Sequence, residues 1–199
     1  MKNRLSKVVI STLLVTSSLV AADWSGSHSV DNVYSFVGIE AGANSLDVEG
    51  NNGTDPAMTD SHDLYHGGLK VGAQSDNYRI YLNANYYDGS DSFDYMTTYG
   101  AGIQYLFNFS NTMNAFIGLN AGVANAKFFV DGETTSRTIS DPYVGGEAGV
   151  NVQLMENIDL EVGARILSMD ISNTKNDITY TFDNMITGYA SINFKYKMD

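Results

Sequence analysis

Hydrophobic and polar residues alternate one by one along residues 158–166. The even-numbered residues from Ile158 to Ile166 are all apolar, whereas Asp159, Glu161 and Arg165 stand between them. In a β-strand, successive side chains point to opposite faces, so a period of two separates apolar from polar residues. The pattern predicts a strand with one apolar face and one charged face.

The same alternation recurs in seven other segments of the chain. They cover residues 34–46, 64–74, 78–87, 95–109, 114–127, 142–154 and 185–198. Short links (75–77, 110–113 and 155–157) alternate with longer ones (47–63, 88–94, 128–141 and 169–184). Eight strands with short turns at one end and longer loops at the other predict an all-β fold: an eight-stranded antiparallel up-and-down barrel.

The N-terminal segment differs from the rest. Lys2, Arg4 and Lys7 precede an apolar run at 8–20, and small residues at 21–22 follow it. This arrangement is typical of a secretory signal, and the apolar run is shorter than the roughly 20 residues of a membrane-spanning helix. We expect residues 1–22 to be a cleaved signal peptide and residues 23–199 to form one barrel domain. A membrane location would then require a closed barrel, because lipid cannot form hydrogen bonds with the unpaired backbone N–H and C=O groups at an open sheet edge.

Composition narrows the possible partners. The formal net charge is −12, and Lys2, Arg4 and Lys7 would be lost with the leader, so the remaining chain would be more acidic still. Nucleic acid is therefore excluded as an expected partner. The chain has no Cys, which rules out disulfides and thiolate metal sites. No cofactor is expected.

The polar face is rich in Gly and Asn, and its few charges have both signs. We expect these charges to pair across a plugged lumen: Glu40, Glu147, Asp159 and Glu161 with Lys70, Arg79, Arg165 and Lys195. His66 shares this face and is interpreted as a hydrogen-bonding group. On the apolar face, aromatic residues gather near the strand ends, as in the interfacial girdles of membrane barrels. A water-soluble barrel, the alternative, would turn its apolar face inward.

These features are similar to those of the small bacterial outer-membrane β-barrel superfamily, which includes the OmpA transmembrane domain, OmpX, OmpW-like proteins and the opacity-type porin family. The resemblance covers the chain after the leader and rests on architecture, not on one motif. It implies a transmembrane barrel in the outer membrane of a Gram-negative cell. The expected partners are outer-membrane lipid, lipopolysaccharide and, during biogenesis, the assembly machinery; the expected state is a monomer.

The longer links hold most of the acidic residues. In the first of them, oxygen ligands for a divalent cation are offered by Asp47, Glu49, Asp55, Asp60 and Asp63. A simple hydrated surface is the alternative, and no metal site is assigned. An EF-hand loop beginning at Asp47 is excluded, because such a loop needs glycine at its sixth position and glutamate at its twelfth. Here glycine falls at the seventh position and Met58 at the twelfth.

Three functions fit this pattern. The first is a structural, adhesion or surface-interaction protein with a plugged lumen and acidic outer loops. The second is a narrow or gated channel for small solutes, although balanced lumen charge favours closure. The third is a lipid A-modifying enzyme, for which His62, Asp91 and Ser92 offer only isolated loop residues. No catalytic residues are expected.

Overall fold

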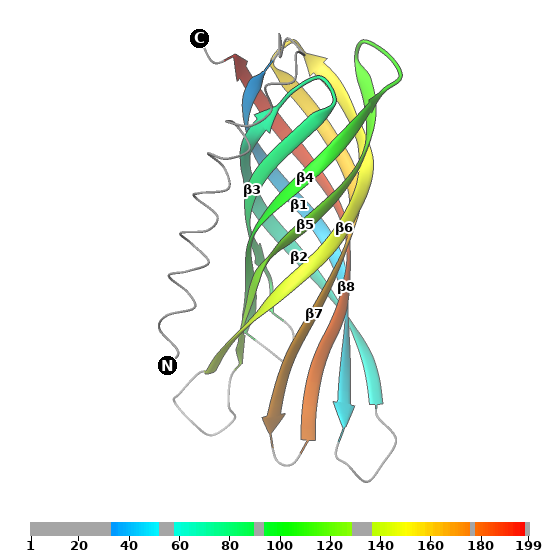
Figure 1. Cartoon of the computed structure of the whole chain (residues 1–199). Coiled ribbons are helices and arrows are strands. Elements are labelled where there is room, and N and C mark those ends of the chain that lie inside the picture. The colour runs from blue at the N-terminus through cyan, green and yellow to red at the C-terminus, as the bar shows by residue number, and fades with distance from the viewer. Residues whose placement is uncertain (1–32, 52–57, 90–93, 129–136, 176–177, 198–199) are drawn as a thin grey trace, which may run out of the picture. The chain divides into compact units, whose positions relative to one another are not determined.

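The computed structural model describes residues 33–51, 58–89, 94–128, 137–175 and 178–197, so the expected signal peptide lies outside the described residues. Eight antiparallel strands form a closed barrel in chain order, with β8 pairing to β1 (Figure 1). The strands are β1 (Tyr34–Asn51), β2 (Met58–Gln74), β3 (Tyr78–Tyr87), β4 (Tyr95–Asn108), β5 (Met113–Phe128), β6 (Arg137–Met155), β7 (Ile158–Lys175) and β8 (Ile178–Lys197). The predicted fold class is confirmed. No helix in the described ranges is long and apolar enough to cross a membrane.

Several strands are longer than the alternation predicts. The links expected at 47–63 and 169–184 are largely strand, since β1 runs to Asn51, β2 starts at Met58 and β7 runs to Lys175. In the link expected at 128–141, β5 ends at Phe128 and β6 starts at Arg137, and residues 129–136 lie outside the described residues. The prediction of long loops is wrong at 47–63 and 169–184. Strand pairing needs only backbone hydrogen bonds, so these strands continue where the apolar outer face ends.

The sheet divides at the end where the longer links lie. Pairing of β6 with β7 stops at Tyr143 and Met169, although both strands continue. The backbone direction along β6 can be assigned from Gln153, which donates its N–H to the carbonyl of Thr112, just before β5, at 2.7 Å. Backbone groups of successive strand residues point to opposite neighbours, so odd-numbered residues of β6 face β5 and even-numbered ones face β7. Residue 142 therefore faces β7, and because it is proline it has no N–H to donate to that strand, where the pairing ends.

Two irregularities in register lie close to this division. One is on β1 between Leu46 and Val48, and the other is on β7 between Ser168 and Ile171; both affect the pairing with β8. Beyond them, the hairpin of β5 and β6 separates from the four strands β7, β8, β1 and β2 (Figure 1). Bulges bend a strand locally, so they allow this divergence without loss of pairing to β8.

The two faces of the barrel wall have opposite chemistry. Large apolar side chains project outward along the middle of the strands, including Ile39, Leu69, Ile103, Leu119 and Ile166, which are 49–68% exposed. Aromatic side chains lie above and below them, and several are in contact: Tyr86 with Tyr95, and Tyr105 with both Tyr78 and Phe107. We call this band of outward apolar residues, between its aromatic rims, the apolar belt.

Candidate functional site

Inside the barrel, the carboxylate of Glu40 on β1 holds together side chains from two other strands. Lys70 Nζ on β2 lies 2.8 Å from its Oε2, and Arg165 Nη1 on β7 donates to Oε1 at 3.0 Å. His66 Nε2 lies 3.0 Å from Oε1. All four side chains are almost fully buried, so both carboxylate oxygens are bound by protein groups.

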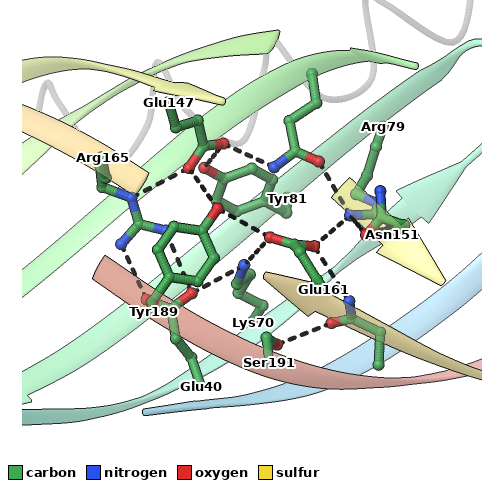
Figure 2. A network of polar contacts seen from close by, with 12 residues as sticks. Glu40, Lys70, Arg79, Tyr81, Glu147, Asn151, Glu161, Arg165, Tyr189 and Ser191 are labelled. Carbon is green, nitrogen blue, oxygen red and sulfur yellow. Dashed lines mark hydrogen bonds and ion pairs between the residues drawn. The ribbon is translucent and has the colours of Figure 1, made fainter. Parts of the chain in front are cut away.

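Glu161 on β7 forms a second centre beside the first (Figure 2). It accepts hydrogen bonds from Lys70 Nζ at 2.7 Å and from Arg79 Nη1 at 2.5 Å. The hydroxyl of Tyr189 donates to it at 2.9 Å and the amide of Asn193 at 3.2 Å. Lys70 therefore joins Glu161 to Glu40 across the lumen.

Glu147 on β6 completes the arrangement. Arg165 Nε donates to its Oε2 at 3.1 Å, while Tyr81 and Gln104 donate to Oε1 at 2.5 and 2.8 Å. The charged side chains now form one unbroken series: Arg79, Glu161, Lys70, Glu40, Arg165 and Glu147. We call these six residues the ionic network. Three acids meet three bases, so burial leaves no net charge uncompensated.

The remaining two predicted lumen residues form a separate pair. Lys195 Nζ on β8 lies 2.8 Å from Asp159 Oδ1 on β7, close to the short-turn end of the barrel. Both are more accessible than the ionic network, although each side chain is only about a tenth exposed or less. The structure thus places all eight predicted residues inside the barrel, in one group of six and one of two.

Aromatic rings fill the space around the charges. Lys70 Nζ lies 4.7 Å from the ring centre of Tyr189, and the Arg165 guanidinium carbon lies 4.6 Å from the same centre. Such contacts stabilise cations that are removed from water. Tyr81 lies against β4 at Gly102, where an added Cβ would come within 2.3 Å of the ring. The lumen at this level is therefore packed with side chains.

Sequence reasoning missed a second group of inward residues. Toward the longer links, the interior is apolar and fully buried: Leu46, Leu64, Tyr87, Met96, Ala124, Ala126, Tyr143, Leu167, Met169, Ile171 and Met185. We call this group the apolar plug. It closes the barrel beyond the ionic network with no charged side chain among its members.

A signal for the apolar plug was present in the alternation itself. On β7, the buried Arg165 is polar and the exposed Ile166 is apolar, whereas in the next two residues the buried Leu167 is apolar and the exposed Ser168 is polar. The chain thus exchanges its polar and apolar faces within one strand. A reading that ended the strand at Ile166 could not detect the change.

Of the five acidic residues proposed as divalent-cation ligands in the first longer link, the structure describes the side chains of only two. Glu49 and Asp63 are exposed on β1 and β2. Asp47 and Asp60 belong to the same strands, but their side chains lie outside the described residues, as does Asp55 entirely. The side chains of the described residues form no metal-binding group of three. The isolated His62, Asp91 and Ser92 side chains are also outside the described part.

Comparison with known proteins supports the architecture. The sequence matches no protein-family model and no curated protein. Neisserial surface protein A is 16% identical, covers 83% of this chain and all of its own, and superposes with a TM-score of 0.63. OprG from Pseudomonas aeruginosa is 13% identical, covers 83% of this chain and 96% of its own, and gives a TM-score of 0.49. The superposition on Neisserial surface protein A therefore shows that the chain shares the barrel fold of that protein.

Proposed function

We propose that this chain is an outer-membrane barrel with a permanently closed lumen, which serves a structural, adhesion or surface-interaction role. The observation that carries the proposal is the ionic network: six charged groups from β1, β2, β3, β6 and β7 joined by contacts of 2.5–3.1 Å across the interior. Eight-stranded barrels have interiors just wide enough for side chains to fill. A conducting lumen typically has charges of one dominant sign instead.

The outer wall supports the membrane location. Among the described residues, large outward apolar side chains gather in the apolar belt, and exposed residues beyond it toward the longer links include the polar Ser140 on β6 and Asp63 on β2. The expected partners are outer-membrane lipid and lipopolysaccharide in the belt, and the assembly machinery during insertion. The strands that extend past the belt would present the surface that contacts other molecules.

Location and orientation can be tested with single cysteines, because the chain has none of its own. Thr138→Cys lies on β6 toward the longer links, and Asn111→Cys lies in the turn between β4 and β5; both positions are exposed. A membrane-impermeant maleimide added to intact cells should label the first variant and leave the second unlabelled until the outer membrane is opened. Labelling of both or neither in intact cells would contradict the proposed location.

Closure can be tested separately in planar bilayers. The refolded wild-type protein should give no stable conductance, and liposomes containing it should not swell in small sugars. Steady open events in most insertions would contradict closure and would support the channel alternative.

A further inference from the structure

A groove of about 1080 Å³ crosses the outer wall of the barrel within the apolar belt, from β7 to β3. It follows the direction of the strand-to-strand hydrogen bonds. One of its sides is a row of paired residues, Ala164, Ala148, Ile117, Tyr105 and Tyr78. Because barrel strands tilt by roughly 35–45°, such a row also descends through the belt.

Small residues form the floor of the groove at the β6–β7 side. Gly146, Ala148 and Ala164 lie there, between Val144 and Ile166, which are 64% and 54% exposed. A Cβ added to Gly146 would meet no atom nearer than 3.9 Å, and the residue has no left-handed backbone. Neither packing inside the protein nor backbone geometry requires glycine at this position. Glycine within a strand often marks a close approach from outside.

The two ends of the groove differ. At the short-turn end, Tyr78 and Tyr105 close it with rings in edge-to-face contact at 5.2 Å between centres. At the other end, the lining residue is Ser168, beside the position where the outer face turns polar. An elongated apolar molecule would therefore enter from the side of the longer links. The one charged lining residue, Glu147, has its carboxylate bound inside the lumen.

We propose that the groove seats one acyl chain of a lipopolysaccharide molecule from the leaflet on the side of the longer links. The inference rests on the proposed outer-membrane location. The groove is continuous with the apolar belt, which would face lipid, and between the tyrosines and Ser168 its outward lining side chains are aliphatic, which matches a hydrocarbon chain. Its open end at Ser168 would leave the headgroup in the interfacial layer, near the exposed polar residues of β6 and β7.

The test fills the groove without altering the rest of the wall. Gly146→Leu places a side chain on the floor of the groove. Gly67→Leu is the matched control, since Gly67 also faces outward on β2 with open space at its Cβ and lies outside the groove. Both variants should fold, as judged by circular dichroism and by the shift in gel migration of an unheated barrel. Each is then reconstituted with purified lipopolysaccharide and phosphatidylethanolamine.

Bound lipid is counted by native mass spectrometry after mild detergent exchange. Most molecules of the wild-type protein and of Gly67→Leu should each retain one lipopolysaccharide. The fraction of Gly146→Leu molecules that retain one should be at least tenfold lower. Equal retention by Gly146→Leu overturns the proposal, as does selective retention of phosphatidylethanolamine. A dimer of the wild type that Gly146→Leu dissociates would assign the groove to a second copy of the chain. These outcomes are independent of the cysteine labelling, which alone tests the membrane location.

Discussion

The ionic network and the apolar plug are equally buried inside one barrel, yet their chemistry is opposite. Around the network, the outer wall is apolar: Ile39 is 57% exposed beside the buried Glu40. On the side of the plug away from the network, polar residues appear on the outer wall: Asp63 is exposed beside the buried Leu64, and Ser168 is exposed beside the buried Leu167. The interior takes the character that its exterior lacks. With the proposed membrane location, this inversion along single strands would mark where the surroundings change from lipid to water.

The two regions also achieve closure by different means. The apolar plug gains free energy from burial and from dense packing, as in a soluble protein. In the ionic network, attraction and hydrogen bonding must offset the large cost of removing charges from water. The network therefore depends on every member, whereas the plug should tolerate conservative exchange.

The largest expected effect is loss of a shared carboxylate. Glu40→Ala leaves Lys70 and Arg165 without one of their partners inside the barrel, so we expect a loss of about 3–5 kcal/mol in the free energy of unfolding. Urea unfolding in lipid vesicles measures it. Glu49→Ala on the same strand is the control, since Glu49 is exposed, and it should change stability by less than about 0.5 kcal/mol. Similar values for both would show that the network is not stabilising.

A somewhat smaller effect is expected in the apolar plug. Leu167→Ala removes a fully buried side chain, which typically costs about 2–5 kcal/mol through lost burial and the cavity left behind. The neighbouring Ile166→Ala changes an outward residue and leaves no cavity, so it should cost clearly less in the same titration. If Ile166→Ala is the more damaging variant, the assignment of inner and outer faces on β7 is wrong.

The inversion can be tested with one substitution on either side of it. Ile39→Arg places a charge on the outer face of the belt, and we expect a cost of about 2–4 kcal/mol if it lies near the bilayer midplane. Thr138→Arg, exposed on β6 beyond the belt, should be close to neutral. Equal costs in vesicles would mean that lipid does not surround the belt.

The smallest effect belongs to an ion pair on the outside. Lys127 Nζ lies 3.4 Å from Asp94 Oδ2, and both side chains are more than a quarter exposed. Lys127→Met should cost about 0.2–1 kcal/mol, because water and side-chain entropy weaken exposed pairs. Molar salt should remove this difference and leave that of Glu40→Ala largely intact, since buried pairs are screened much less. Equal salt sensitivity of the two variants would contradict the burial of the ionic network.

Much of the barrel follows from local pattern. Alternation is a property of neighbouring residues, so it predicted the number of strands, their outward faces and the charged residues of the lumen. It failed at the strand ends near Asn51, Met58, Arg137 and Lys175. There most residues of the sequence are polar and the regular alternation ends, whereas backbone pairing continues the strand.

By itself, the sequence determined which side chains share a face, because a period of two needs no knowledge of distant residues. Only the tertiary structure decided which acid meets which base. Glu40 and Arg165 are 125 residues apart and meet at 3.0 Å because barrel closure places β1 and β7 on either side of β8, with both side chains pointing into one narrow lumen. The apolar plug and the groove at Gly146 have the same origin, since each is assembled from side chains of several strands.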